Sequence, residues 1–266
     1  NNESANTTAV GYNSLFSNTT GLSNTAIGYQ ALYENEDGDA NTAIGSNALY
    51  NFEADADGHG WNVAVGANAA QGLTTGTQNV AIGYAALDNS SGTGDHNVSI
   101  GNGSMSSNTS GASNISIGSS SMGANATGEN NTAVGHQALY TNVAGDNSVA
   151  IGMNALYTSN PSGNADMYNT AVGYAAGQYM TTGTNNTVYG ASAGKGITTG
   201  VNNIAVGKDT MAATCVGSNT VAVGASALNA VEDGEDNTAI GHNALMANVS
   251  GDNNVAIGRA ALGACT

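Results

Sequence analysis

A short apolar phrase recurs from one end of this chain to the other. Residues 24–28 read Asn-Thr-Ala-Ile-Gly, and related phrases occur fifteen times, mostly 17 residues apart, with one spacing of 18 and two of 21. These repeats cover about residues 7–262 and no change of composition interrupts them, so the sequence predicts a single domain over residues 1–266. The closing glycines, which define position 0 of each repeat, are Gly11, Gly28, Gly45, Gly66, Gly83, Gly101, Gly118, Gly135, Gly152, Gly173, Gly190, Gly207, Gly224, Gly241 and Gly258.

Each position of the repeat has a restricted composition. Position −1 is Ile or Val in fourteen repeats, position −2 is Ala in twelve, position −3 is always Thr, Val or Ile, and position −4 is Asn in twelve. Positions −4 to 0 therefore predict a short strand. Positions +1 to +4, which usually end in Leu or Met, predict a second short strand after a bend at the glycine. The remaining residues are mostly Asn, Asp, Gly, Ser and Thr, which is typical of turns.

Two short strands and two turns per repeat predict one coil of an all-β parallel β-solenoid with about fifteen 17-residue coils. Glycine at position 0, and at position −7 in twelve of the fourteen segments between repeats, is expected to allow positive φ at the corners. Asparagine at position −4 is expected to bond to its equivalents in neighbouring coils. The residues taken to represent this structural repeat are Asn24, Ile27, Gly28, Asn41, Ile44, Gly45, Asn131, Val134, Gly135, Ile151, Gly152, Asn254, Ile257 and Gly258.

The first strand is apolar on both of its faces. Positions −3 and −1 share one face and are Thr, Val or Ile, whereas positions −2 and 0 share the other and are mainly Ala and Gly. A strand of this kind is normally buried on both faces. One face can fill the interior of its own coil, and the repeats offer no helix to cover the other. We therefore expect a second copy of the chain to cover it, and a lone solenoid with one exposed face is the alternative.

Charge excludes two classes of partner. The chain has 3 Lys and Arg against 19 Asp and Glu, a net charge of −16, so a nucleic-acid groove or a polybasic membrane patch is excluded. No apolar run approaches the roughly 20 residues of a membrane span, and we expect no membrane insertion in this segment. Residues 1–10 lack the charged and apolar regions of a signal peptide, and no initiator Met is present, so we expect a processed or partial segment of a longer protein.

Acidic turns are the first candidates for chemistry. Residues 34–39, 53–58 and 232–236 offer carboxylate oxygens that could bind Ca²⁺. They match neither the twelve-residue helix-loop-helix loop nor the nine-residue Ca²⁺ roll repeat, so solubilising turns are the favoured interpretation and no cofactor is expected. No position is acidic throughout the repeats, which argues against the paired carboxylates of a glycosidase.

Histidines and cysteines are scattered along the chain. The histidines lie in different phases or well-separated coils, so we expect solvated turn residues at His59, His96, His136 and His242. Cys215 and Cys265 are about three coils, or ~14 Å, apart. A disulfide needs Cα atoms within about 7 Å, so free thiols or interchain bonds are expected.

Aromatic residues recur at two positions. Position +5 carries Phe16, Tyr33, Tyr50, Tyr140 and Tyr157, and position +1 carries Tyr12, Tyr29, Tyr84 and Tyr174. Such side chains suit weak contacts with sugars, but stacking on one another at the coil edges is the favoured interpretation for any individual residue. The candidate glycan contacts are Tyr33, Tyr50, Phe52, Trp61, Tyr140 and Tyr157.

The repeat resembles the head repeats of trimeric autotransporter adhesins, which carry Asn-Ser-Val-Ala-Ile-Gly motifs like residues 147–152. Residues 24–32, Asn-Thr-Ala-Ile-Gly-Tyr-Gln-Ala-Leu, are also similar to repeats of bacteriophage tail fibres. The resemblance covers about residues 7–262, although the adhesin repeats are usually shorter than 17 residues. It implies a left-handed β-roll and a parallel homotrimer.

Repeat, charge and resemblance together predict a structural and adhesive fibre segment without enzymatic activity. It would be extracellular, on a cell or virion surface, and would give reach and attachment to a host or environmental glycan or protein. A glycan-degrading tailspike enzyme is one alternative. An ice-binding solenoid is another, although Thr occupies position −3 in only seven repeats.

Overall fold

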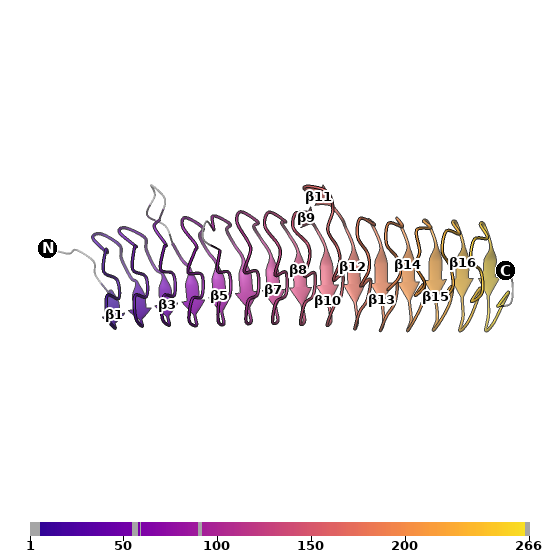
Figure 1. The fold of residues 1–266 in the computed structure, drawn as a ribbon, viewed down its shortest axis with the longest axis horizontal. Coiled ribbons are helices and arrows are strands. Elements are labelled where there is room, and N and C mark those ends of the chain that lie inside the picture. Colours follow the sequence, from indigo (N-terminus) through magenta and orange to yellow (C-terminus); the bar gives the residue numbers. More distant parts are fainter. Residues whose placement is uncertain (1–5, 55–57, 59, 90–91, 264–266) are drawn as a thin grey trace. The chain divides into compact units, whose positions relative to one another are not determined.

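A computed structural model describes residues 6–54, 58, 60–89 and 92–263 of the chain, which divides into two compact units, Asn1–Asn131 and Thr132–Thr266. Both units are all-β, and the described residues contain no helix. Within each unit, every repeat contributes one three-residue strand to a parallel sheet (Figure 1). Each unit is therefore a parallel β-solenoid, and the predicted fold class is confirmed.

Strands of the main sheet cover positions −3 to −1 of each repeat. In the first unit these strands are β1 (Thr8–Val10), β2 (Thr25–Ile27), β3 (Thr42–Ile44), β4 (Val63–Val65), β5 (Val80–Ile82), β6 (Val98–Ile100) and β7 (Ile115–Ile117). In the second unit they are β8 (Thr132–Val134), β10 (Val149–Ile151), β12 (Thr170–Val172), β13 (Thr187–Tyr189), β14 (Ile204–Val206), β15 (Val221–Val223), β16 (Thr238–Ile240) and β17 (Val255–Ile257).

Strand pairing keeps equal repeat positions in register. Ala26 of β2 pairs with Ala43 of β3, which pairs with Ala64 of β4. The two 21-residue spacings each contain a four-residue insertion, within residues 52–61 and 158–168. The second insertion adds a small parallel pair outside the main sheet, in which β11 (Ala165–Asp166) lies beside β9 (Gly145–Asp146). The insertion therefore extends a turn and leaves the repeat register intact.

Small residues fill the narrow interior of each coil. Ala26 at position −2 is wholly buried, and so are the adjacent residues Ala31 and Leu32 at positions +3 and +4. In the coil of Gly190, Val replaces Ala at position −2 and Gly replaces Leu at position +4. A Cβ atom added to Gly194 would lie 2.4 Å from Cγ1 of Val188, so the larger residue at one position requires the smaller one at the other.

The predicted second strand at positions +1 to +4 is wrong. These residues form a turn in which positions +2 and +4 have left-handed backbones, for example φ 52° at Gln30 and 53° at Leu32. In an extended strand, neighbouring side chains point to opposite faces. The left-handed residues instead let Ala31 and Leu32 both point inward, while hydrogen bonds such as Leu32 N–H to Ala48 O still join neighbouring coils.

Glycine has a different role at each of its two repeated positions. At position 0 the prediction of positive φ is confirmed, with φ 140° at Gly28, where a Cβ atom would also lie 2.4 Å from the carbonyl oxygen of Gly45. At position −7 the prediction is wrong, because Gly21 and its equivalents are absent from the residues with positive φ. A Cβ atom at Gly21 would lie 2.5 Å from Asn18 Oδ1 of the same coil and 2.6 Å from the carbonyl oxygen of Gly38 in the next coil, so close packing selects glycine there.

Buried asparagines form the predicted ladder at position −4. Asn41 donates its side-chain amide to Asn24 Oδ1 at 3.2 Å, and its backbone N–H donates to the same oxygen at 2.9 Å. The Asn24 amide donates in turn to the Gly38 carbonyl. A second ladder at position +7 was not predicted; in it Asn35 donates to Asn18 Oδ1 at 3.0 Å. The amide groups of both ladders thus replace much of their lost water with hydrogen bonds to the adjacent coil, although Asn35 Oδ1 is buried without a partner.

Candidate assembly surface

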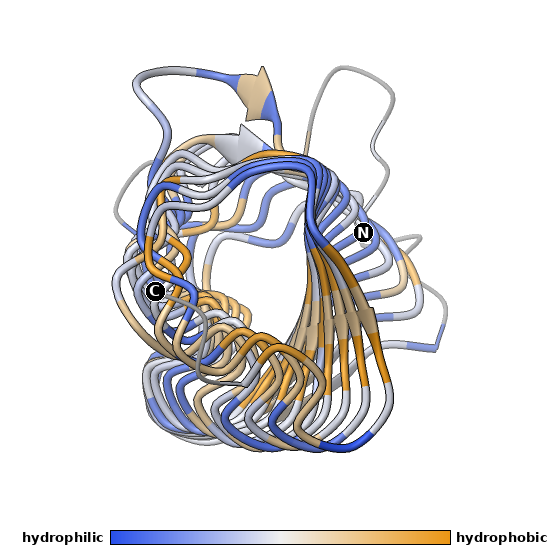
Figure 2. Cartoon of the chain, turned by 90° about the vertical axis from the view of Figure 1, so that its right-hand side faces the viewer, coloured by the Kyte–Doolittle hydropathy of each residue, from blue (hydrophilic) through white to orange (hydrophobic). Residues whose placement is uncertain are grey.

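The outer face of each main sheet carries two parallel columns of β-branched side chains. Position −2 points into the coil, so positions −3 and −1 point outward. Figure 2 shows hydrophobic residues recurring on this side in successive coils. Ile27, Ile82 and Ile151 at position −1 are 38%, 37% and 39% exposed, even though each has neighbours in the coils before and after. Large continuous apolar surfaces of this kind mark interaction sites.

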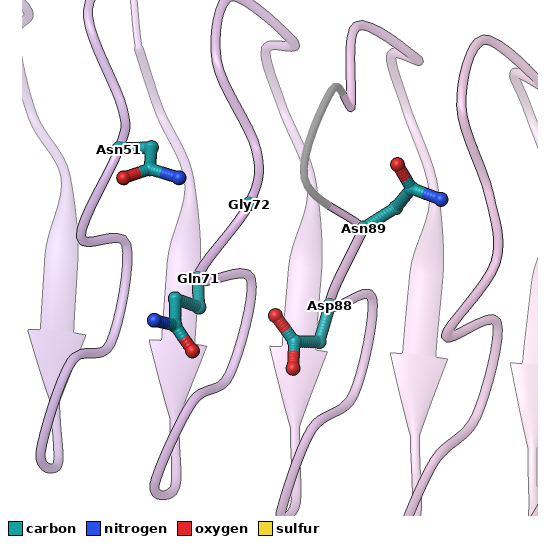
Figure 3. Close-up of a pocket in the computed structure, with 5 residues that line it drawn as sticks. All are labelled: Asn51, Gln71, Gly72, Asp88 and Asn89. Atoms are coloured by element: carbon teal, nitrogen blue, oxygen red, sulfur yellow. The ribbon is translucent and has the colours of Figure 1, made fainter.

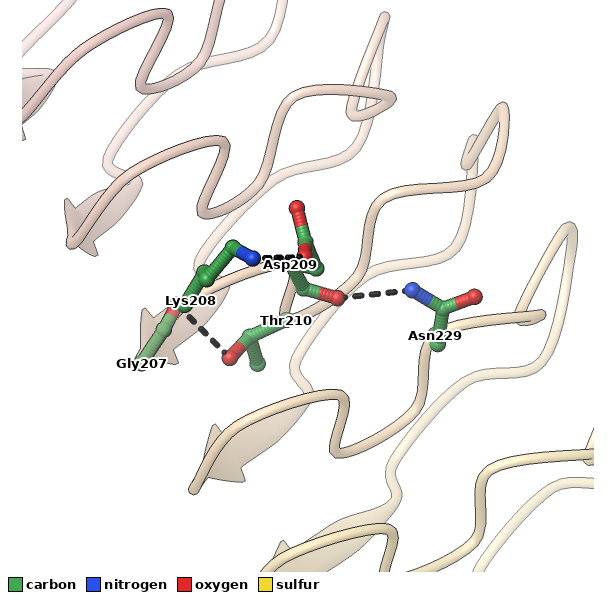
Figure 4. Close-up of polar contacts among 5 residues, drawn as sticks. All are labelled: Gly207, Lys208, Asp209, Thr210 and Asn229. Carbon is green, nitrogen blue, oxygen red and sulfur yellow. Dashed lines mark hydrogen bonds and ion pairs between the residues drawn. The ribbon is translucent and has the colours of Figure 1, made fainter.

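Charged side chains lie away from these two columns. The main-sheet strands contain no charged residue, and the acidic residues that the structure describes belong to the turns and the small β9–β11 pair. In the second unit, Lys208 lies 3.5 Å from Asp209 at an exposed turn (Figure 4). Asn229 of the next coil donates to the Asp209 carbonyl at 2.8 Å. Such an exposed ion pair contributes little stability. The strand face differs from these charged turns because it is uncharged and repeats regularly.

Aromatic residues at position +5 stack on one another. The ring centroids of Tyr33 and Tyr50 are 5.0 Å apart, those of Phe16 and Tyr33 are 5.2 Å apart, and those of Tyr140 and Tyr157 are 5.3 Å apart. Tyr33, Tyr50, Tyr140 and Tyr157 are all partly exposed. Stacking covers both ring faces of Tyr33, which leaves its edge and hydroxyl for an outside ligand. Burial and the nearby Glu34 carboxylate raise the pKa of Tyr50.

Residues of the two insertions divide between the interior and the surface. Phe52 is wholly buried at position +7, so the prediction that it contacts a glycan is wrong; it packs in the core where other coils place Asn or Leu. Trp61 is 47% exposed and has φ 51°. Tyr168 occupies the equivalent position after the second insertion, with 54% exposure and φ 49°. Tyr168 is not among the predicted glycan contacts, although it lies five residues before position 0 of the next repeat, as Trp61 does.

The remaining candidate groups lie apart from one another. His96, His136 and His242 are exposed, whereas His59 and Cys265 lie outside the described residues. Cys215 is a free, wholly buried thiol, and this burial raises its pKa to about 11. Within the described ranges, no three His, Cys, Asp or Glu residues are grouped so that they could hold a metal ion, although Asp55 and Asp57 fall outside those ranges. The same ranges contain no helix able to span a membrane.

Fold and surface together define this chain as a repetitive parallel β-solenoid with a regular apolar strand face. No protein-family model matches the chain, and no curated protein sequence does. The geometry of the repeat is therefore the basis for its proposed function.

Proposed function

We propose that this chain is a segment of an extracellular structural and adhesive fibre, in which three parallel copies assemble through their strand faces. The observation that carries the proposal is the uncharged face at positions −3 and −1, where isoleucines stay more than a third exposed in a single chain. The resemblance to adhesin heads and tail fibres supports three as the number of copies and a cell or virion surface as the location.

A second copy of the chain suits this face because both surfaces have the same period. Equal repeat positions lie in register from strand to strand, so side chains recur at the spacing of neighbouring strands, about 4.8 Å. An identical sheet has ridges and gaps at the same spacing, whereas an irregular globular partner would match only a few coils. The acidic turns lie outside the proposed contact, so assembly buries no unpaired charge.

Attachment is proposed to reside in the turns and in the aromatic columns. The main-sheet residues are committed to the coil or to assembly, while the exposed aromatic side chain of Trp61 rises from a turn. A trimer would present each such residue three times, and three weak contacts combine into useful avidity. The role is non-enzymatic, which is supported by the scatter of carboxylates over turns of different phase.

Light scattering on the purified chain tests the assembly directly. A trimer gives three times the chain mass of 26.1 kDa. A monomer that stays soluble at micromolar concentration would contradict the proposal. In that case ice binding becomes the better account, because the threonines at position −3 lie on the outward side of the sheet; thermal hysteresis of the monomer would then test it.

A further inference from the structure

We infer that the first unit contains a lateral binding pocket for uncharged saccharides. The pocket has a volume of about 390 Å³ and is lined by Asn51, Gln71, Gly72, Asp88 and Asn89 (Figure 3). Small-molecule sites range from about 300 to 1,000 Å³, so it has room for one small ligand. These residues occupy positions +5 and +6 of three successive coils, a surface separate from the strand face.

The lining side chains match the chemistry of sugar hydroxyl groups. Asn51 and Gln71 each bring an amide that can both donate and accept a hydrogen bond, and the Asp88 carboxylate accepts. Figure 3 shows these three side chains on neighbouring coils, with the Asp88 carboxylate on the side of Gln71. The Asn89 amide donates to the Ser107 carbonyl at 3.1 Å, which fixes that wall of the pocket. A ring with several hydroxyl groups can satisfy donors and acceptors at this density.

An aromatic ladder ends beside the pocket. Tyr50 stacks on Tyr33 through one ring face, and its other face is directed toward the next coil, where Gln71 occupies the same repeat position. The backbone joins these two coils at this point, since the Asn51 N–H donates to the Gln71 carbonyl at 3.1 Å. Aromatic faces suit the apolar faces of sugar rings, and Tyr50 directly precedes the lining residue Asn51, although Tyr50 itself does not line the pocket.

Charge selects an uncharged ligand over an acidic one. All of the Lys and Arg residues, Lys195, Lys208 and Arg259, belong to the second unit, so the first unit offers no lysine or arginine to pair with a carboxylate or sulfate. Asp88 is partly buried, and this burial raises its pKa although the Gly72 N–H bonds to its carboxylate. An anionic sugar placed against Asp88 would meet like charge in a partly desolvated site.

A glycan array tests this inference with matched variants. The array would carry neutral oligosaccharides beside their sialylated, sulfated and uronic-acid counterparts. The wild-type chain should bind neutral members, and Gln71→Ala and Asp88→Ala should each weaken that binding about tenfold or more by removing a hydrogen-bonding group. Gln178→Ala is the control, because Gln178 occupies the same repeat position in the second unit; it should bind as the wild-type chain does.

Three outcomes would overturn the saccharide site: no neutral glycan bound, binding restricted to acidic glycans, or Gln71→Ala and Asp88→Ala binding as tightly as Gln178→Ala. Circular dichroism of each variant verifies that the fold is kept. The inference deepens the attachment role proposed above but does not depend on assembly. Light scattering of the same samples separates the two, since a trimer without glycan binding contradicts only the pocket, and a glycan-binding monomer contradicts only the assembly.

Discussion

Replacing Ile151 by Asp is the sharpest test of the assembly surface. Ile151 lies at position −1 of β10 and is 39% exposed in the single chain. Complete burial of an isoleucine side chain is worth about 1.5–3 kcal/mol, so covering the remaining part is worth roughly 1 kcal/mol. Summed over the fourteen Ile and Val residues at this position, the column alone supplies on the order of 10 kcal/mol per chain. Association costs about 4–15 kcal/mol, so burial of this column offsets the lower part of that range, and burial of position −3 adds to it.

The substitution acts very differently in a monomer and in a trimer. In a monomer, the introduced carboxylate would keep its water, and the change should lower the free energy of unfolding by only about 1 kcal/mol. In the proposed trimer, three carboxylates would be buried without partners, each at a cost of several kcal/mol. The expected result is therefore loss of the trimer mass, with the mass falling to that of one chain, 26.1 kDa.

Val143→Asp is the matched control for this experiment. Val143 is 40% exposed, nearly the same as Ile151, and lies in the same unit, but it belongs to a turn rather than to the strand face. It should keep the wild-type mass. Light scattering and thermal melts on both variants test whether the strand face is an interface between copies. An Ile151→Asp chain with wild-type mass and melting temperature would show that it is not.

Three further experiments test the interior and the pocket. Gly194→Ala should destabilise the fold by about 1–3 kcal/mol through contact with Val188, and Val188→Ala in the same chain should recover much of that loss; additive effects in thermal melts would contradict the coupling. In a chain that carries Cys265→Ser, Cys215 should resist thiol reagents at pH 8 and react once the chain is unfolded. Burial raises the pKa of Cys215 to about 11 and excludes the reagent, so rapid labelling of the folded chain would contradict this burial. The raised pKa of Asp88 means that its charged form disfavours folding, so the loss of folding free energy grows as the pH rises through the folded pKa. Asp88→Asn should therefore raise the melting temperature at pH 7 and raise it less at pH 3. An equal gain at both pH values would exclude the charge of Asp88 as the cause.

The period of the sequence determined the architecture. A β-branched triplet closed by glycine every 17 residues can be satisfied by in-register parallel strands, and these are found from β1 to β7 in the first unit and from β8 to β17 in the second. The Asn24–Asn41 pair was predictable for the same reason, because residues in register meet their equivalents one coil away. The repeat therefore encodes both the strand and its neighbours.

Two features could have been read from the sequence but were not. Ala31 and Leu32 are adjacent apolar residues, and an extended strand cannot point both inward. That conflict indicated the turn with left-handed residues which the structure shows at positions +2 and +4. The exchange of Asn for Phe52 or Leu73 at position +7 likewise indicated a mostly buried column whose members are chiefly amides or apolar side chains.

Only the tertiary structure decided the roles of individual side chains outside the strands. The glycines at positions 0 and −7 look alike in sequence, but whether φ or a carbonyl of the next coil selects glycine depends on distances between coils. Phe52 and Trp61 flank the same insertion, yet one is core and the other surface. The pocket joins Asn51, Gln71 and Asp88, which belong to three repeats. A repeat pattern fixes which residues share a column, whereas exposure and cavity shape depend on the side chains of the neighbouring coils, and those differ from repeat to repeat.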